Sequence, residues 1–401
     1  MKIERKEYLD KIIALKDKQI IKVVTGVRRC GKSTLLELFQ EYLRNNGVAD
    51  EQIVAVNLED YDYEELCEPK NLHTYIKERL AKGKMTYVFI DEVQRCREFP
   101  KVVDSLYIKN NVDLYLTGSN AELLSSEIAT LISGRYIEIS MLPLSFKEFV
   151  EGTGNSDNLS QKYREYLEIS SFPYAINLQN QPKEIKSYLE GLYNTIVVKD
   201  ISSRRKISDT MMLESVVRFV FDNIGSPLST KKIADTMTSA GRKIDVKTVE
   251  KYLSALMESF IVYQATRYNI KGKQHLKTLE KYYAVDIGLR YMLLGSRSTD
   301  IGHILENIIY LELIRRGYEV YVGKVDELEV DFVAVEHNRT IYYQVAATVR
   351  DESTLQRELA PLQKINDHYQ KFILTLDEDP EADYDGIRRI NALEWLMGEI
   401  G

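Results

Sequence analysis

The sequence predicts an α/β protein that begins with a parallel sheet covered by helices and continues into smaller domains. Three observations predict it. Apolar runs typical of buried strands alternate with helical stretches over the first 150 residues, as in sheets covered on both faces. A phosphate-loop pattern joins the first of these runs to a helix. The length of 401 residues exceeds what one hydrophobic core usually organises, so two to four domains are expected.

The composition excludes several classes of protein. Apolar residues make up 44% of the chain and charged residues 29%, which is typical of a globular protein rather than a disordered one. No apolar run is long enough to span a bilayer, and the charged N-terminus is not a secretory signal, so we expect no membrane partner. The net charge of −7 argues against a protein coated by nucleic acid, although it allows a local basic surface.

Cysteine usage indicates a reducing compartment. The three cysteines, Cys30, Cys67 and Cys96, are far apart and include no C-x-x-C pair. We therefore expect neither a disulfide framework nor a metal framework, and we expect a cytoplasmic location.

The stretch IIKVVTGVRRCGKSTLLELFQ, residues 20–40, indicates a nucleotide site. It holds G-x-x-x-x-G-K-S between an apolar run and a helical pattern. The glycines let the backbone turn and point N–H groups inward, and the helix N-terminus adds positive dipole. Lys32 then reaches the terminal phosphates, and the Ser33 hydroxyl binds a magnesium ion that bridges them. The predicted site comprises Gly26, Val27, Arg28, Arg29, Cys30, Gly31, Lys32, Ser33 and Thr34.

Four further apolar runs and two helical stretches complete the predicted sheet. One run, MTYVFIDEVQ, ends in Asp91 and Glu92. An acid that leaves a buried strand beside a phosphate loop can hold magnesium, and the acid after it can polarise the attacking water. Two acids at a strand end are often no more than solvated side chains at the edge of a sheet. The phosphate loop upstream favours the catalytic interpretation here. The runs are 52–60, 85–94, 112–120 and 135–146, and the helices 71–82 and 99–109.

Two more catalytic candidates lie at strand ends. The run VDLYLTGSN ends in Ser119 and Asn120. We assign the orientation of water against the terminal phosphate to Asn120, with Ser119 as the alternative, although a simple turn explains these residues nearly as well. Arg135, before the last strand, either stabilises charge on the transferred phosphoryl group or is a surface residue.

Five motifs, in this order, resemble a known family. TGVRRCGKSTLL, YVFIDEVQ, LTGSNAELL, SGRY with LPLSFKEF, and FPYAI at 172–176 are similar to those of prokaryotic AAA-type P-loop ATPases that carry a C-terminal domain of unknown function. The resemblance covers essentially the whole chain. It implies ATP as the nucleotide, Mg2+ as its cofactor, and an additional-strand sheet. In such a sheet the 112–120 strand lies between the phosphate-loop strand and the acidic strand.

Beyond this core the sequence predicts a loop, a helical lid and a winged helix. The stretch EGTGNSDNLS, residues 151–160, lacks periodicity and predicts the loop. Helical stretches at 161–169 and 182–201 predict the lid. Residues 211–268 then predict three helices followed by a strand rich in β-branched and aromatic residues. Residues 245–258 take the position of a recognition helix. The expected helix caps are Ser229 and Asp245.

Basic residues gather in and after the predicted winged helix. Residues 229–251 contain six Lys or Arg against three acids, and 267–277 adds four without an acid. Such a surface can track DNA phosphates. A winged helix used only for packing or protein interaction explains the pattern equally well. The basic residues are Lys231, Lys232, Arg242, Lys243, Lys247, Lys251, Arg267, Lys271, Lys273 and Lys277.

The segment from GHILEN to QVAATV predicts one helix and three strands and resembles the restriction-endonuclease-like fold. In such enzymes acids from the helix and the second strand bind metal, and the third strand adds an acid and then a lysine. Glu306 and Asp331 match the first two positions, and Glu329 shares the strand face of Asp331. Gln344 and Ala346 stand at the third-strand positions, where neither brings a charge. We therefore favour an inert scaffold over a nuclease.

Three functions follow from these features. The leading hypothesis is an ATP-hydrolysing protein that couples nucleotide state to DNA or protein binding. The alternatives are a nucleotide-gated protein-interaction switch with slow turnover, and an ATP-gated DNA nuclease. The partners left open are DNA and further copies of the chain in a homo-oligomer. The predicted domains are an AAA-type P-loop ATPase core (1–150), a helical lid (151–206), a winged helix (207–268) and a degenerate restriction-endonuclease-like α/β domain (269–401).

Overall fold

The chain folds into two compact units. The first comprises residues 1–143 with 258–260, and the second comprises 144–257 with 261–401. The finer division of the second unit into lid, winged helix and C-terminal domain stays a prediction. The computed structural model describes these residues: 3–119, 134–154, 158–296, 300–337 and 339–398.

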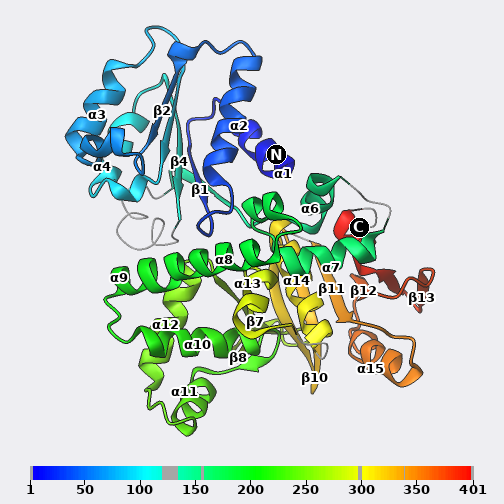
Figure 1. The fold of residues 1–401 in the computed structure, drawn as a ribbon. Coiled ribbons are helices and arrows are strands. Elements are labelled where there is room, and N and C mark those ends of the chain that lie inside the picture. The colour runs from blue at the N-terminus through cyan, green and yellow to red at the C-terminus, as the bar shows by residue number, and fades with distance from the viewer. Residues whose placement is uncertain (1–2, 120–133, 155–157, 297–299, 338, 399–401) are drawn as a thin grey trace. The chain divides into compact units, whose positions relative to one another are not determined.

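A five-stranded sheet, with all neighbouring strands parallel, forms the centre of the first unit (Figure 1). The order is β2-β3-β4-β1-β5, which confirms the predicted place of β4 between the phosphate-loop strand and the acidic strand. Helices α1 and α2 cover one face and α3 and α4 the other, as right-handed crossovers require. The elements are α1 Lys6–Ala14, β1 Ile21–Thr25, α2 Lys32–Asn45, β2 Ile53–Asn57, α3 Pro69–Glu78, β3 Thr86–Asp91, α4 Phe99–Tyr107, β4 Val112–Gly118 and β5 Tyr136–Ser140.

The central strands of this sheet are apolar because both of their faces are covered. Strands β1, β3 and β4 are buried along their whole length, as in parallel sheets with helices on both sides. Lys22 on β1 and Asp113 on β4 are polar exceptions that form a buried ion pair. Burial lowers the pKa of Lys22 and raises that of Asp113, while their mutual attraction opposes both shifts.

The second unit begins with a largely helical half and continues into a mixed α/β half. Asp245 and Ser229 cap their helices as predicted, because their side chains accept the N–H groups of Thr248 and Lys232. None of the described helices is long and apolar enough to cross a membrane. The elements are α6 Phe146–Thr153, α7 Leu159–Ile169, α8 Pro182–Tyr193, a π-helix Asn194–Ile201, α9 Ser202–Arg205, α10 Thr210–Asp222, β6 Pro227–Leu228, α11 Thr230–Ser239, α12 Val246–Glu258, β7 Val262–Asn269, β8 Gln274–Ala284, α13 Ile287–Leu294, α14 Ile301–Arg315, β9 Glu319–Val325, β10 Leu328–Glu336, β11 Arg339–Ala346, α15 Glu352–Gln363, β12 Gln370–Thr375, β13 Ala382–Tyr384, β14 Ile387–Asn391 and α16 Ala392–Met397.

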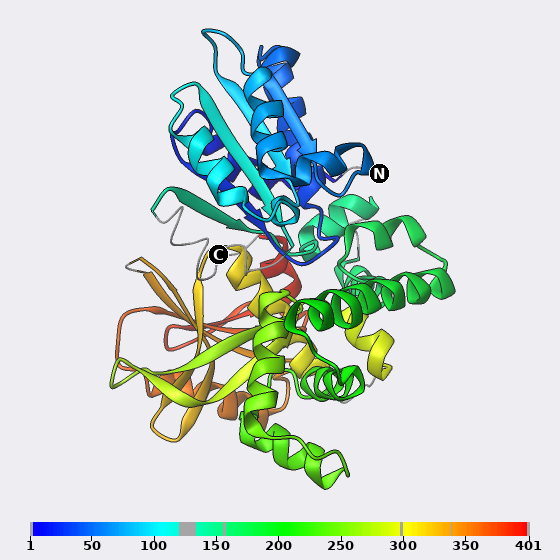
Figure 2. The ribbon, with the colours of Figure 1, turned by 90° about the vertical axis from the view of Figure 1, so that its left-hand side faces the viewer.

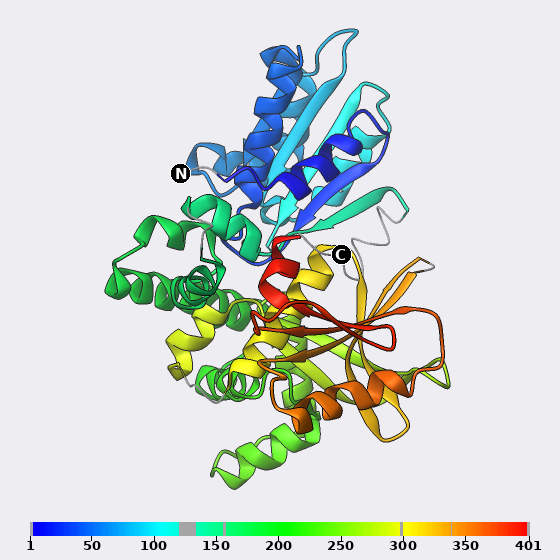
Figure 3. The same ribbon diagram turned by 90° about the vertical axis from the view of Figure 1, so that its right-hand side faces the viewer.

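One sheet runs through most of the second unit (Figure 2). Its order is β13-β14-β12-β11-β10-β9-β7-β8-β6. Strands β7 and β8 form an antiparallel hairpin, and β7 pairs in parallel with β9. The hairpin is therefore continuous with the C-terminal strands. Helix α14 packs against β8, β9, β10 and β11, and α15 lies across β10, β11, β12 and β14 (Figure 3).

The loop expected over 151–160 is shorter than the sequence suggested. Helix α6 extends to Thr153 because Ser145 and Glu148 form a capping box at its start, and Gly154, with φ +70°, ends it. The Asn158 side chain then caps α7. The sequence analysis also missed α13 and α15, which lie between the segments that it assigned.

Gly26, directly after β1, allows a close approach of two backbone segments, and this generates the first prediction. Its φ is +145°, and an added Cβ would lie 2.1 Å from the Met141 carbonyl oxygen. We expect Gly26→Ala to lower the free energy of unfolding by about 2 kcal/mol or more, measured by urea unfolding. Gly191→Ala, in helix α8, is the control: its added Cβ meets no neighbouring group outside its own helix within 4 Å, so it should leave the free energy of unfolding unchanged or raise it by up to about 1 kcal/mol. A Gly26→Ala variant as stable as the parent would contradict the close approach.

Candidate functional site

The phosphate loop turns directly from β1 into α2. Gly31, with φ +104°, is the residue before α2, and Arg29 also takes a left-handed conformation with φ +68°. Lys32 is buried, with 4% of its surface exposed. Its ammonium donates to the carbonyls of Gly26 and Val27, at 3.0 and 3.2 Å. The Lys32 side chain therefore folds back over the phosphate loop that precedes it. It lies at the N-terminus of α2, where the helix dipole attracts anions.

The remaining residues of the loop differ in their surroundings. Cys30 is fully buried, whereas Ser33 is exposed at the start of α2. The Arg28 guanidinium pairs with Glu59, which follows β2, at 2.6 Å. Thr34 is half-buried. The loop thus presents the Ser33 hydroxyl to solvent while its interior is fixed by the protein.

Asp91 and Glu92 leave β3 beside this loop. Both are buried, at 8% exposure. The Thr117 hydroxyl donates to the Asp91 carboxylate and accepts the Glu92 N–H, the latter at 2.9 Å. The Glu92 carboxylate accepts hydrogen bonds from Ser119, at 3.2 Å, and from the Gln94 side-chain amide. Glu92 itself has φ +51°, a left-handed conformation that residues other than glycine adopt at a cost.

Strand β4 brings the loop and the acids to one edge of the sheet. Thr25, the residue before the loop, is in register with Gly118 on β4. On its other side β4 carries Thr117, which contacts Asp91 at the end of β3. Carboxyl ends of parallel strands are where α/β sheets bind ligands. Sequence reasoning missed Thr117 and Gln94, and the only signal for Thr117 was a hydroxyl at the end of an apolar run.

Of the two remaining catalytic candidates, one is not described by the structure and the other, Arg135, is not brought to this edge. Asn120 lies outside the described residues, but its alternative, Ser119, contacts Glu92. Arg135 lies at the opposite edge, because its carbonyl accepts the N–H of Ile21, the first residue of β1. A five-residue strand is roughly 17 Å long. Within one chain, therefore, the structure does not bring Arg135 to the phosphate loop. Its side chain pairs with Asp104.

The residues at this edge fit a nucleotide with magnesium. Among the described residues there is no group of three or more His, Cys, Asp or Glu that could hold a metal ion. Magnesium on a nucleotide needs fewer, since it takes its other ligands from phosphates and water. The Asp91 carboxylate, fixed by Thr117, and the exposed Ser33 hydroxyl supply oxygen donors of the right kind.

A second cluster of charged residues is buried in the second unit. Lys281, on β8, has its ammonium 2.8 Å from Glu306 on α14, 2.8 Å from Glu329 and 3.6 Å from Asp331, both on β10. The Tyr283 hydroxyl also donates to Glu306, at 2.7 Å. Sequence reasoning found the three acids and missed Lys281, because the lysine comes from a strand outside the compared segment.

Gln344 and Ala346 stand on β11, at the third-strand positions of the restriction-endonuclease-like pattern, and both side chains contact other parts of the protein. The Gln344 side chain accepts the N–H of Asp331, at 2.8 Å, and donates to Glu358 on α15, at 2.7 Å. Its amide group is thus held by two partners. Ala346 is buried in the adjoining core. Neither position supplies charge to the acids.

Charge and burial compete in this cluster. Burial, followed by the negative charge of Glu306, raises the pKa of Asp331 to about 7. Burial alone would lower the pKa of Lys281, but the three carboxylates, Glu306 first, outweigh burial and raise it. Burial would likewise raise the pKa of Glu306, and Lys281 reverses that shift, so the pKa is lowered. The ammonium is the internal counter-charge of the cluster.

The basic residues of the predicted winged helix fall into two classes. In the 267–277 segment, Lys271 pairs with Asp326 at 2.7 Å, and Arg267 lies 3.9 Å from Glu329. These two charges are partly neutralised inside the protein. The lysines of α11, α12 and their connection are exposed, and the structure records no ion pair for them among the described residues. They are Lys231, Lys232, Lys243, Lys247 and Lys251.

Two solved structures illustrate the limited similarity to proteins of known structure. One is the Aeropyrum pernix ORC1 protein in complex with DNA, 14% identical, covering 72% of this chain and 91% of that chain, with a TM-score of 0.32. The other is AMPPCP-bound DnaA from Aquifex aeolicus, 13% identical, covering 63% and 86%, with a TM-score of 0.33. Both TM-scores lie below 0.5, so they do not support a shared architecture over the whole chain.

Relatives and family models match at higher similarity. An uncharacterized protein of Haemophilus influenzae is 39% identical over 400 residues, which is 98% of each chain. One from Methanocaldococcus jannaschii is 28% identical and covers 86% of this chain and 78% of that protein. Residues 160–300 match a domain of unknown function (DUF8612). Residues 18–150, which contain the phosphate loop and both acids, match the AAA domain family. The chain therefore belongs to the same family as the Haemophilus influenzae protein, and its residues 18–150 are similar to the AAA domain family.

Proposed function

We propose that the protein hydrolyses ATP and couples its nucleotide state to the binding of DNA or another protein. One observation carries the proposal: Asp91 and Glu92 are buried and fixed by Thr117 and Ser119 at the edge where the phosphate loop leaves β1. A solvated strand end has no need for such support. The buried Lys32 ammonium beside the loop carbonyls is the second support.

Each residue of this edge has a role in the proposed reaction. Lys32 and the loop N–H groups bind the terminal phosphates. Ser33 and Asp91 would hold a magnesium ion, which would supply positive charge to the phosphates. Glu92 accepts the proton of the attacking water, and Ser119 and Gln94 orient its carboxylate. Hydrolysis then breaks the bond between the β- and γ-phosphates and transfers the γ-phosphoryl group to the water oxygen.

Two further catalytic roles are part of the proposal. Asn120, or Ser119 as the alternative, orients the attacking water. Arg135 lies at the far edge of the sheet from the phosphate loop of its own chain. A role for Arg135 in hydrolysis therefore requires a second copy of the chain, and we propose a homo-oligomer on this ground.

The proposed DNA contact is a winged helix formed by α10, β6, α11, α12 and the β7–β8 hairpin. The order of helices and strands supports this assignment. Five exposed lysines, for which the described part of the chain offers no ion pair, lie on α11, on α12 and between them. The 267–277 segment is the weaker part of the proposed surface, because Arg267 and Lys271 have carboxylate neighbours.

We propose that the C-terminal part is a scaffold with a restriction-endonuclease-like fold rather than a nuclease. The support is the Lys281 ammonium, which lies among Glu306, Glu329 and Asp331 and takes the place that a divalent cation needs. A buried cluster of this kind is costly to break, because removing one partner leaves uncompensated charge.

The nucleotide site generates the first prediction on function. We expect Lys32→Ala to lose tight ATP binding, because the phosphates lose their cation. Glu92→Gln should bind ATP normally and hydrolyse it at least about 100-fold more slowly. Binding is measured with a fluorescent ATP analogue and turnover by phosphate release. Parental turnover in Glu92→Gln would show that the base is another residue. Turnover with and without DNA then separates the coupled ATPase from a slow protein-interaction switch.

The basic surface generates a salt-dependence prediction. Each phosphate contact on duplex DNA contributes about −0.9 to the slope of log affinity against log salt. Replacing Lys243, Lys247 and Lys251 by alanine should flatten the slope by about two to three units. The double replacement of Lys271 and Lys273 should change it by about one unit or less. Fluorescence anisotropy at several salt concentrations measures both. No binding by the parent at low salt would instead favour the protein-interaction switch.

The scaffold assignment generates a pH prediction. In the folded chain Asp331 has a pKa of about 7, against about 3.9 in an unfolded chain. Between these values only the unfolded state releases the proton, so the free energy of unfolding falls as pH rises from about 4 to about 7. Asp331→Asn does not titrate, so its stability relative to the parent should rise over this interval in urea unfolding. Magnesium-dependent DNA cleavage that Asp331→Ala abolishes and Lys32→Ala retains would contradict the scaffold.

A further inference from the structure

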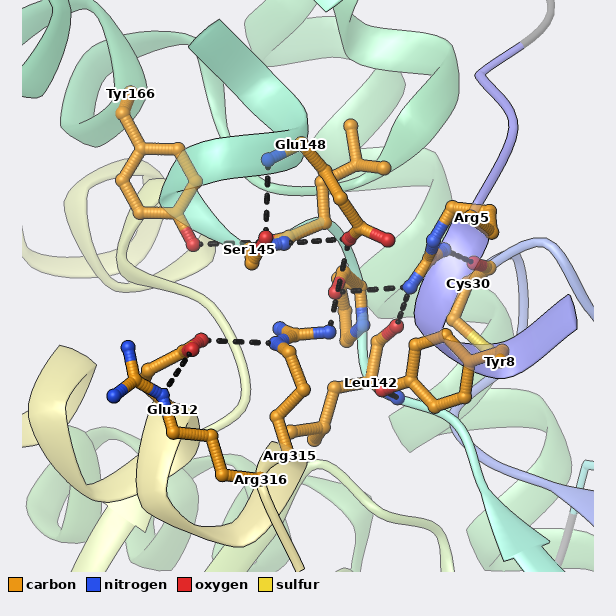
Figure 4. Close-up of polar contacts among 12 residues, drawn as sticks. Arg5, Tyr8, Cys30, Leu142, Ser145, Glu148, Tyr166, Glu312, Arg315 and Arg316 are labelled. Atoms are coloured by element: carbon orange, nitrogen blue, oxygen red, sulfur yellow. Dashed lines mark hydrogen bonds and ion pairs between the residues drawn. The ribbon is translucent and has the colours of Figure 1, made fainter. Parts of the chain in front are cut away.

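A buried arginine near the N-terminus binds the phosphate loop from outside. Arg5 is 3% exposed and has a left-handed backbone, with φ +49°. Its guanidinium donates to the carbonyl of Cys30, in the phosphate loop, at 2.8 Å, and to the carbonyl of Leu142, after β5, at 2.6 Å (Figure 4). The same group lies 3.4 Å from the Pro143 carbonyl. One side chain therefore joins three segments that are distant in the sequence.

The bond to Cys30 orients the loop for anion binding. In a trans peptide the C=O and the following N–H point in opposite directions. Because the Cys30 carbonyl points to Arg5, the Gly31 N–H of the same peptide unit points away from Arg5. A charged donor on the carbonyl also polarises the peptide and strengthens its N–H as a donor. Arg5 therefore prepares a phosphate-binding N–H without contacting the phosphate.

The segment after β5 is held to the loop at further points. The Met141 N–H donates to the Thr25 carbonyl, at 2.8 Å, directly before the loop. The Leu142 N–H donates to the hydroxyl of Tyr8, at 3.1 Å. Gly26 leaves room for the Met141 carbonyl, which an added Cβ would meet at 2.1 Å. Movement of the loop therefore requires movement of residues 141–143.

The chain that follows Pro143 is held just as closely within the second unit. The Leu144 N–H donates to the Ser171 carbonyl, at 2.8 Å, and the Tyr166 hydroxyl donates to the Leu144 carbonyl, at 2.9 Å. The next residue, Ser145, opens α6 through its capping box with Glu148. Arg315, on α14, lies 3.8 Å from the Glu148 carboxylate. Figure 4 shows the Ser145–Glu148 capping box and the Arg315–Glu148 contact. Residues on both sides of the Pro143–Leu144 peptide bond are therefore hydrogen-bonded, each within its own unit.

We propose that Arg5 is a positioning residue that fastens the phosphate loop to the connection between the two units and so transmits nucleotide state to residues 144–148. The inference rests on the proposed ATP binding. When bound nucleotide shifts the Cys30–Gly31 peptide, the hydrogen bond to the Cys30 carbonyl displaces the Arg5 guanidinium. The guanidinium in turn displaces the carbonyls of Leu142 and Pro143, to which it also donates. Pro143 and Leu144 share a peptide bond, and through this bond the change at Pro143 is passed to the Leu144 N–H and the start of α6.

Hydrogen–deuterium exchange with and without a non-hydrolysable ATP analogue tests this proposal in the full-length protein. In the parent we expect the analogue to change exchange both in the loop and across residues 141–148. Arg5→Ala should weaken analogue binding about tenfold, as expected for losing a charged hydrogen bond. At a saturating concentration of the analogue, Arg5→Ala should keep the analogue-induced change in exchange in the phosphate loop. It should lose the analogue-induced change in exchange at residues 144–148. Arg5→Lys should restore part of both, since it keeps the charge but holds fewer carbonyls.

Two further variants keep the test independent of folding defects. Tyr8→Phe removes the hydroxyl that accepts the Leu142 N–H and leaves Arg5 in place, so it should keep analogue affinity within about twofold and still reduce the analogue-induced change in exchange at residues 144–148. Arg44→Ala, which removes an exposed pair with Asp50, is the matched control and should behave like the parent. A parent that binds the analogue with a change in the loop but none at 144–148, or an Arg5→Ala variant that retains both, overturns the proposal. A parent that binds no analogue overturns the proposed function itself.

Discussion

The position of β4 between β1 and β3 is the constraint on which the candidate site depends. The phosphate loop follows β1 and the two acids stand at the end of β3, with β4 between these strands. On β4, Gly118 is in register with Thr25, directly before the loop, and the Thr117 hydroxyl donates to Asp91 and accepts the Glu92 N–H. That second bond holds Glu92 in its left-handed conformation. Strain at this residue persists because the surrounding sheet determines it.

Both units neutralise buried charge internally rather than exposing it. In the first unit Lys22 and Asp113 pair inside the sheet, at the edge away from the phosphate loop. In the second unit the Lys281 ammonium pairs with the carboxylates of Glu306, Glu329 and Asp331. Such groups contribute little net stability but fix one arrangement, because any other arrangement leaves a buried charge without a partner. They are therefore well suited to hold the register of strands that carry a site.

The continuous sheet of the second unit links two regions that the sequence predicted as separate domains. The expected boundary between 268 and 269 falls inside β7, which pairs with β9. Lys281, from β8 of the same hairpin, contacts acids of α14 and β10. A partner that binds the hairpin would thus act directly on the C-terminal sheet. The β7–β8 hairpin and the C-terminal strands thus belong to one sheet.

Spacing and periodicity predicted most of the local elements and the candidate nucleotide site, although not α13 or α15. The loop from Gly26 to Ser33 and the acids at the end of β3 can be recognised because spacing and periodicity are local properties. Which distant residues meet becomes visible only in the folded chain. Arg5 at Cys30, Thr117 at Asp91 and Lys281 among three acids have no sequence signature, because a buried polar contact depends on strand order and register. For the same reason Arg135, beside the last strand in sequence, lies at the edge away from the phosphate loop.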